Sequence, residues 1–160
     1  MNRLIIYIVV LMSVLFVACD ANVVFDDSQK IDDNVWNMQN KRTFSVNIKT
    51  IDRTSLYRFA INISNTKDYK YNNIYFFLTT IYPDESISVD TIECELTRPD
   101  GTWKGKEFGG VIDNRFWFAH NVEFKQNGTY TFRLQQATTD TNLVGVKSVG
   151  LHIEKMPTKE

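Results

Sequence analysis

Hydrophobic and polar residues alternate along most of this chain from residue 43 onward. In TFSVNIKT, Phe44, Val46 and Ile48 share one face, and polar residues occupy the other. A period of two residues is typical of a β-strand with one buried face. The same alternation, or a short apolar run typical of a central strand, recurs in LYRFAINIS (56–64), NIYFFLTTIY (73–82), SISVDTIECELT (86–97), RFWFAHNVEF (115–124), TYTFRLQQA (129–137) and VKSVGLHIEK (146–155).

Turn sequences separate these segments. RPDG at 98–101 predicts a tight turn, since Pro99 presets φ and Gly101 accepts a positive φ. QNGT at 126–129 predicts a β-hairpin. SISVDTIECELT is long enough for two strands or one bent strand. Because no convincing helical stripe occurs, we predict an all-β fold: a single antiparallel, jelly-roll-like β-sandwich of seven or eight strands over residues 41–160.

The first 18 residues have a different pattern. A single cation, Arg3, precedes an apolar run from Leu4 to Ala18 that only Ser13 interrupts. Fifteen helical residues span about 22 Å, whereas a membrane-spanning helix usually needs about 20 residues. Asp20 follows the run instead of a basic flank. These features favour a cleaved signal peptide over a membrane-spanning helix.

The sequence FVAC at 16–19 resembles the bacterial lipobox, in which a small residue precedes the modified cysteine. Ala18 fits that position, whereas Phe16 departs from the usual leucine. Lipidation joins the thiol to diacylglycerol, and cleavage leaves Cys19 as the new N-terminus. Two or three acyl chains then hold the protein on a membrane. The alternative is an ordinary signal peptide with a chance cysteine near its cleavage site.

Residues 19–40 predict a lipidated tether followed by a docking segment. The acidic pairs Asp26–Asp27 and Asp32–Asp33 lack the glycine and terminal glutamate of a calcium loop. We therefore interpret them as solvated linker residues. Val35 and Trp36 are expected to pin this segment to the domain.

Composition narrows the possible functions. The length of 160 residues suits one domain. The net charge of −1 gives no indication of a nucleic-acid partner. With Cys19 acylated, Cys94 remains alone at the parity of Ile92 and Leu96, which predicts a buried, unreactive thiol.

The titratable residues do not form a recognisable catalytic or metal site. His120 shares the parity of Phe116 and Phe118, which predicts a hydrogen-bonded histidine at a sheet edge, or less readily a ligand or a base. His152 alternates with apolar neighbours and is expected to face solvent. Two distant histidines and one thiol do not make a zinc site, so we predict no metal, no cofactor and no catalytic residue. A hydrolase with dispersed carboxylates stays possible, since four are available: Asp84, Glu85, Glu93 and Glu95.

A glycine-rich segment, GTWKGKEFGG at 101–110, lacks the ending of a phosphate-binding loop. Its glycines predict a loop or a β-bulge. Trp103 and Trp117 either cap the sandwich or offer stacking faces to a sugar ring. The alternative function is therefore a carbohydrate-binding β-sandwich lipoprotein.

Several segments resemble the GldH family of gliding motility lipoproteins. NISNTKDYKYNNIYFFL at 62–78 is similar to the family's entry into its central strand, and DTIECELTRPDGTWKGKEFG at 90–109 to its Trp-Gly block. NGTYTFRLQQA and LVGVKSVGLHIEK resemble its closing strands. The positions that carry this resemblance are Asn65, Tyr69, Tyr71, Asn73, Ile74, Asp90, Thr91, Leu96, Gly101, Trp103, Gly105, Gly128, Tyr130, Gln136, Ala137, Leu143, Gly145, Val149, Gly150 and Ile153.

The resemblance implies a non-enzymatic Bacteroidota envelope lipoprotein that is a component or assembly factor of the gliding motility and type IX secretion machinery. It implies a lipid-anchored location, expected to be the outer membrane, and partners among the other envelope proteins of that machinery. Because loops on a rigid scaffold often carry function, we expect partner-binding residues in two loops: Asn65, Tyr69, Tyr71 and Asn73 in one, and Gly101, Trp103 and Gly105 in the other.

Overall fold

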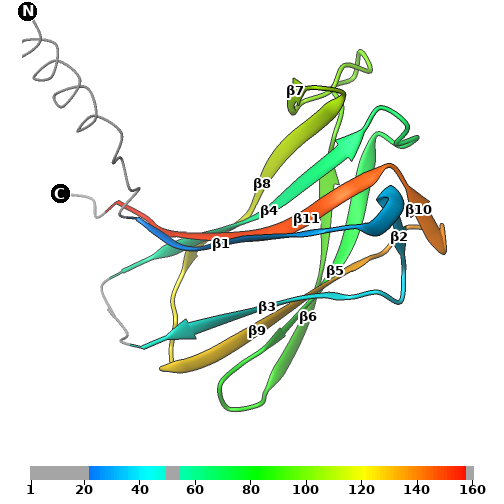
Figure 1. Cartoon of the computed structure of the whole chain (residues 1–160). Coiled ribbons are helices and arrows are strands. Elements are labelled where there is room, and N and C mark those ends of the chain that lie inside the picture. Colours follow the sequence, from blue (N-terminus) through cyan, green and yellow to red (C-terminus); the bar gives the residue numbers. More distant parts are fainter. Residues whose placement is uncertain (1–21, 50–54, 158–160) are drawn as a thin grey trace, which may run out of the picture.

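The computed structural model describes residues 22–49 and 55–157, which form two packed antiparallel β-sheets (Figure 1). The predicted all-β antiparallel sandwich is confirmed. Each of the seven segments predicted from alternation contains one strand. Four further strands, for which the alternation gave no indication, bring the described total to eleven.

The upper layer in Figure 1 is a five-stranded sheet, and the lower layer is a four-stranded sheet. In spatial order, the upper sheet contains β1 (Val23–Lys30), β11 (Val146–Lys155), β4 (Tyr57–Thr66), β8 (Val111–Val122) and β7 (Lys106–Phe108). The lower sheet contains β3 (Arg42–Ile48), β9 (Gly128–Gln136), β5 (Asn73–Ile81) and β6 (Ile87–Glu95). A short pair at one end joins β2 (Val35–Asn37) to β10 (Asn142–Val144), and a 3₁₀ turn, η2 (Asp32–Asn34), precedes β2.

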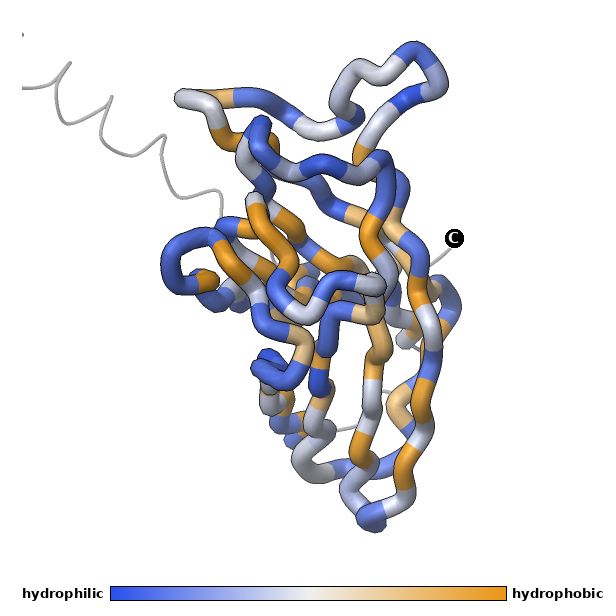
Figure 2. The backbone as a smooth tube through the Cα atoms, turned by 90° about the vertical axis from the view of Figure 1, so that its right-hand side faces the viewer, coloured by the Kyte–Doolittle hydropathy of each residue, from blue (hydrophilic) through white to orange (hydrophobic). Residues whose placement is uncertain are grey.

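The core lies between the facing surfaces of the two sheets. Figure 2 shows hydrophobic and hydrophilic residues alternating along the strands, as a half-buried sheet requires. The apolar side chains that point inward meet those of the opposite layer. Fully buried members from both sheets are Phe44, Phe76 and Leu134 below, and Ile61, Leu151 and Ile153 above.

The segment expected as a tether and docking segment contains a sheet strand. Residues 23–30 form β1, which pairs with β11 along its whole length. Its acidic residues obscured the strand pattern, although charged residues are common on edge strands because they discourage aggregation. Trp36 is 1% exposed and donates its indole N–H to Asn40 O at 2.7 Å, so it pins the next part of the segment, whereas Val35 is 38% exposed and does not.

The predicted hairpin at 126–129 is wrong. The strands on either side, β8 and β9, belong to different sheets, so this connection crosses one end of the sandwich. Phe124 lies in the core there, with its ring 4.8 Å from the ring of Tyr57 and 4.9 Å from that of Tyr130. A glycine turn permits chain reversal, but tertiary burial of Phe124 decides where the chain goes. The RPDG turn is confirmed: Gly101 has a φ of +82° and donates its N–H to Arg98 O at 2.9 Å.

The expected signal peptide and Cys19 lie outside the described residues. Within residues 22–49 and 55–157, no helix has the length and apolar character needed to cross a membrane.

Candidate functional site

The two long sides of the sandwich differ in how they are closed. On one side, edge strands β1 and β3 meet. The rings of Phe25 and Phe44 pack edge to face with centroids 6.4 Å apart, and Gln29 Nε2 donates to Thr43 O at 2.8 Å. On the opposite side lie β6, the edge strand of the lower sheet, and β8, which the three-residue strand β7 covers at one end only, and β6 and β8 do not pair with each other. We call these the closed side and the open side.

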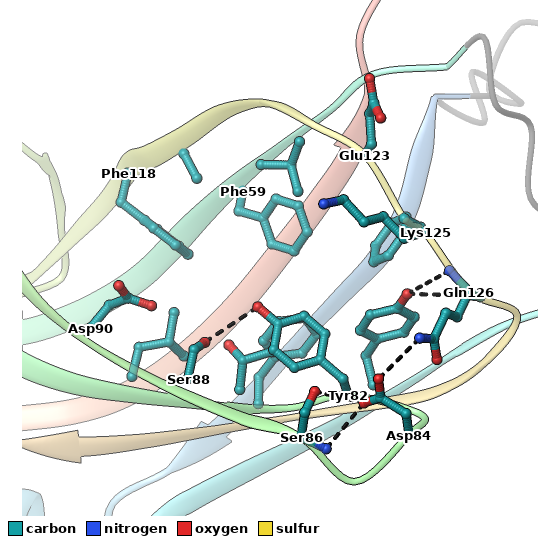
Figure 3. A pocket seen from close by; sticks show the side chains of 17 residues that line it. Phe59, Tyr82, Asp84, Ser86, Ser88, Asp90, Phe118, Glu123, Lys125 and Gln126 are labelled. Atoms are coloured by element: carbon teal, nitrogen blue, oxygen red, sulfur yellow. Dashed lines mark hydrogen bonds between the residues drawn. The ribbon is translucent and has the colours of Figure 1, made fainter.

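A cleft of about 430 Å³ enters the sandwich at the open side (Figure 3). The side chains of Phe59 and Phe118 extend into the cleft from the upper sheet, and β5 and β6 form the lower wall of the cleft. The floor is mainly aromatic and aliphatic, and the rim carries charged and hydroxyl groups. The apolar lining residues are Phe59, Leu78, Phe118, Ala119, Val122, Phe124, Tyr130 and Phe132.

The rim of the cleft is acidic. Asp84, Asp90 and Glu123 line it, and Lys125 is the one cation among the described residues that line it. Asp84 Oδ1 accepts from the Ser86 hydroxyl at 2.6 Å and from the Ser86 N–H at 3.0 Å, and Oδ2 accepts from Gln126 Nε2 at 3.0 Å. These bonds, led by the Ser86 hydroxyl, hold the pKa of Asp84 below its ordinary value. The rim therefore attracts positively charged groups at neutral pH.

The outer edge of β6 has no strand partner among residues 22–49 and 55–157, so it presents unpaired backbone groups there. Bonds from Tyr82 N–H to Ser86 O and from Leu96 N–H to Asn72 O flank the unbroken β5–β6 register at its two ends. Hydrogen-bonded and non-bonded pairs alternate in an antiparallel ladder, so Ile87, Val89 and Thr91 belong to non-bonded pairs with β5. Their N–H and C=O groups therefore point away from β5, toward the free edge.

The outer face beside this edge is apolar. Ile87 and Val89 are each 63% exposed, although both are large and hydrophobic. Tyr75 and Phe77 of β5 share this outer face and are also exposed. Exposed apolar residues gathered on one edge are typical of an interaction surface rather than of a free surface.

Strand β8 is shaped differently from β6. It pairs with β7 only from Val111 to Asp113, so its outer edge from Arg115 onward has no strand partner in the described chain. Opposite Tyr57–Ala60, β8 carries two extra residues, and Asn121 has a φ of +57°. Such bulges bend and twist a strand and are frequent at edges and near sites. They turn both Phe118 and Ala119 toward the cleft.

The bulges also correct the prediction for His120. On a regular strand, His120 would lie on the same face as Phe116. The two extra residues of β8 move it to the exposed outer face instead. His120 is therefore not among the core-facing side chains.

The prediction that His152 faces solvent is wrong, because this residue is 1% exposed. Its Nε2 lies 2.9 Å from Glu154 Oε2, and its Nδ1 lies within ion-pair distance of Asp26 without hydrogen-bond geometry, at 3.0 Å from Oδ2. The Trp117 ring covers it edge to face at 5.5 Å. Because β11 is central, its outer face is covered by side chains of β1 and β8.

The carboxyl group of Glu154 is tied into the same outer-face cluster. Burial raises the energy of its charge, but hydrogen bonds from His152 and Arg58 outweigh this and hold the pKa of Glu154 below its ordinary value. The cluster thus links β1, β11 and β4 by polar contacts and reinforces the closed side.

Neither candidate tryptophan forms an open stacking platform. Arg58 Cζ lies 4.0 Å from the ring centre of Trp117, so a guanidinium occupies one face of that indole. Trp103 is half-buried and packs against the core next to an isolated bridge with Thr97. A flat, exposed indole in a groove is therefore not present at either position.

The residues expected in two partner-binding loops come together at the far end from the cleft rim, and several are buried. Asn65 is fully buried, and its Oδ1 accepts from Asn114 Nδ2 at 3.1 Å. Tyr69 is 3% exposed and donates its hydroxyl to Asn73 O at 2.8 Å. These side chains shape the loop from inside.

The rest of this predicted set is more accessible. Tyr71, Asn73, Trp103 and Gly105 are half-buried, and Gly101 is exposed. Asn73 Nδ2 also donates to Glu93 Oε1 at 2.6 Å, which connects this loop to β6.

Cys94 is fully buried, as its parity predicted. Burial raises the pKa of its thiol to about 12, so the nucleophilic thiolate is essentially absent at neutral pH. Among the described residues, no group of three or more histidine, cysteine or acidic side chains could hold a metal ion.

Comparison with known proteins identifies relatives of this chain. A family model described as "GldH lipoprotein" matches residues 23–153, which include both edges of the open side. The chain is 32% identical over 157 residues to a "Gliding motility lipoprotein GldH homolog" of Christiangramia forsetii, covering 94% of each chain. It is 27% identical over 155 residues to the "Gliding motility lipoprotein GldH" of Flavobacterium johnsoniae, covering 92% of this chain and 94% of the relative. The resemblance seen in the sequence is confirmed: this chain belongs to the GldH family of gliding motility lipoproteins, and it is a membrane-anchored protein of the cell envelope.

Proposed function

We propose that this protein is a non-catalytic component or assembly factor of the gliding motility and type IX secretion machinery, anchored by lipid on Cys19, with the outer membrane as its location. The observation that carries the proposal is the family match across residues 23–153, together with nearly full-length relatives named for gliding motility. The open side of the sandwich supports a binding role, since it leaves an apolar-floored cleft with an acidic rim between β6 and β8, which do not pair with each other.

The short distance from Cys19 to the sandwich supports action beside a membrane. Only three residues separate Cys19 from Val23, the first residue of β1. A fully extended chain covers at most about 3.6 Å per residue, so the acylated cysteine lies within about 15 Å of the sheet. Confinement of this kind raises the local concentration of neighbours and reinforces modest interfaces.

The environment of the candidate nucleophile and acid supports a non-catalytic role. Cys94 is buried with a raised thiol pKa. Asp84, the best-tethered acid of the cleft, has both carboxylate oxygens engaged in structural hydrogen bonds and a lowered pKa, which is unfavourable for a general acid. The two loops that carry the family resemblance, 65–73 and 101–105, supply a further accessible surface for partners through Tyr71 and Trp103.

The test begins with deletion of the chromosomal gene in the source bacterium. Three forms are then used for complementation: the natural chain, the Cys19→Ala variant, and a Cys19→Ala variant to which the signal peptide and lipidated cysteine of an unrelated lipoprotein have been added. Export of type IX cargo and colony spreading are measured. We expect the first and third forms to restore the lost phenotype and Cys19→Ala alone to fail. Unimpaired export and spreading after deletion would refute the proposal.

Affinity capture of the membrane-extracted protein identifies its neighbours. We expect subunits of the secretion machinery to co-purify with the natural chain and to be depleted with Cys19→Ala. Recovery of glycans without those subunits would contradict the proposal and favour the carbohydrate-binding alternative. Mass spectrometry of the mature N-terminus checks the anchor itself, because a diacylglyceryl thioether on Cys19 has a defined mass.

A further inference from the structure

We propose that the free edge of β6 is a docking site for an extended, basic segment of a partner protein, which adds a fifth strand to the lower sheet and inserts alternate apolar side chains into the cleft. This inference deepens the proposed function, because it names the chemistry by which a neighbouring envelope protein is recognised. It rests on the backbone, side chains and charge of the open side.

The backbone supplies the main-chain contacts. Residues 87, 89, 91, 93 and 95 belong to non-bonded pairs with β5, so their N–H and C=O groups face the open edge. The register between β5 and β6 runs without a shift from Ile81–Ile87 to Asn73–Glu95. A regular edge of this length is a ready template for strand addition, in which main-chain bonds give affinity.

Side chains on both faces of β6 select what is added. A new strand beside β6 places alternate residues on opposite faces of the sheet. On the outer face they lie next to the exposed Ile87 and Val89. On the inner face they enter the cleft, whose floor includes Phe59 and Phe118. The occupant therefore has apolar residues on both faces along several positions.

The acidic charge of this edge favours a basic partner segment. The cleft rim carries Asp84, Asp90 and Glu123 against Lys125, and Glu93 lies further along the same strand. A segment with lysine or arginine beside its apolar residues complements this edge. A second copy of the chain is disfavoured, because antiparallel pairing of two β6 strands brings acidic residues together.

The neighbouring edge of β8 is less suited to accept a strand. Its two extra residues and the positive φ of Asn121 break the regular spacing of backbone groups. Bulges of this kind are a common protection against strand pairing. On the open side, the regular strand β6 is thus the acceptor, and the bulged strand β8 forms the opposite wall of the cleft.

The probe is a synthetic eight-residue peptide of six valines and two lysines, so that valine lies on both faces of an added strand. It is compared with a peptide in which glutamates replace the two lysines. It is also compared with two N-methylated forms of the lysine peptide, one methylated at its odd-numbered amides and the other at its even-numbered amides. Binding to the full-length lipidated protein in nanodiscs is measured by fluorescence anisotropy. We expect the lysine peptide to bind at least tenfold more tightly than the glutamate peptide. N-methylation of the amides that face β6 is expected to weaken binding at least tenfold.

Hydrogen exchange locates the bound peptide. The amides of Val89 and Thr91 face the free edge, so we expect them to exchange quickly in the unbound protein and at least tenfold more slowly in the complex. Protection of the same amides without peptide, together with a dimeric mass of the detergent-extracted protein, would assign the edge to a second copy and overturn the proposal.

A charge exchange keeps the test independent of folding. Asp90→Lys is expected to reverse the preference, so that the glutamate peptide binds more tightly than the lysine peptide, whereas Asp68→Lys in the distant β4–β5 loop keeps the original preference.

Thr91→Pro removes one outward N–H without removing a bond to β5, and it is expected to weaken lysine-peptide binding at least tenfold. Equal affinity of the lysine, glutamate and N-methylated peptides would overturn the proposal.

The outcome is separable from the proposed function. If the peptides do not discriminate while gene deletion still blocks export, only the docking site on β6 is wrong. If the lysine peptide binds as expected while deletion has no effect on export or spreading, the assigned role in the machinery is wrong and the docking chemistry stands.

Discussion

The closed and open sides of this sandwich both end in edge strands, yet the two edges meet on one side and stay apart on the other. At the closed side, Phe25 and Phe44 join β1 to β3, and the polar cluster around His152 ties β1 to the strands beside it. At the open side, no comparable aromatic pair joins β6 to β8 in the described structure. A cleft with an acidic rim occupies that position instead.

This difference indicates where the chain has been shaped for stability and where it leaves surface for other molecules. Exposed apolar residues and unpaired backbone groups carry a risk of aggregation, which most edges suppress. The β1 edge suppresses it with Asp26 and Asp27, and the β8 edge does so with bulges. The β6 edge keeps Ile87 and Val89 exposed, which is consistent with a partner that covers them.

The largest expected effect contrasts the aromatic residues of the two sides. Phe44→Ala should lower the free energy of unfolding by about 3–5 kcal/mol, because it empties a fully buried site in the closed side. Phe118→Ala should cost only about 1–2 kcal/mol, because the half-buried ring borders a cleft that solvent can fill. Urea denaturation followed by tryptophan fluorescence measures both. Equal costs would show that the open side is packed as tightly as the closed side.

A second contrast uses two glycines that both have positive φ. Gly145→Ala should cost about 2–4 kcal/mol, since its φ is +91° and the new Cβ would lie 2.6 Å from Tyr69 N. Gly101 has a φ of +82°, but a new Cβ there would lie in open space, so Gly101→Ala should lower the free energy of unfolding by only about 1 kcal/mol. Thermal unfolding of both variants separates backbone strain from steric overlap. Similar melting temperatures would contradict the close approach at Tyr69.

A third contrast uses acid. The pKa of Glu154 is lowered in the folded protein, so its stabilising contribution is complete above the ordinary value of 4.5 and is lost as pH falls through the lower folded-state pKa. Glu154→Gln should therefore cost about 1 kcal/mol at pH 7 and reduce the loss of stability below pH 4.5. Glu123→Gln at the open side should change stability by less than about 0.5 kcal/mol. Urea midpoints measured from pH 3 to pH 7 distinguish the two, and identical profiles would argue against the polar cluster as a support of the closed side.

The smallest expected effect concerns the exposed edge itself. Val89→Lys should change the free energy of unfolding by less than about 0.5 kcal/mol, because the residue is 63% exposed and its side chain packs little in the free protein. Val144→Lys, at a residue 51% exposed on β10, is the matched control. In the source bacterium, Val89→Lys is expected to impair export while Val144→Lys leaves it unchanged. A large loss of stability in Val89→Lys would mean that the edge serves folding rather than docking.

The strands were largely predictable from local pattern, and the failures have local causes. Segments such as TFSVNIKT bury every second residue, so alternation alone identified them. The alternation did not identify β1, because Asp26 and Asp27 are both exposed at an edge, where packing does not require alternation. His120 and His152 were misplaced because bulges and a covered outer face change burial without changing the sequence period.

The candidate site was less predictable than the fold. SISVDTIECELT showed a strand and its acidic residues, but nothing in it indicated that β6 would be an edge. The family resemblance pointed instead to loops 65–73 and 101–105, where Asn65 and Tyr69 prove to be buried. Positions that characterise a family include those that hold the fold, and sequence alone does not separate them from positions that touch partners.

By itself the sequence determined that this is an all-β chain of the GldH family, because alternation is a local property and family motifs are read residue by residue. Only the tertiary structure decided which edges meet, which outer-face histidine is covered, and that β6 and β8 stay apart around a cleft. Those features depend on contacts between residues far apart in the chain, such as Phe25 with Phe44 and Asp26 with His152, whose pairing no local period encodes.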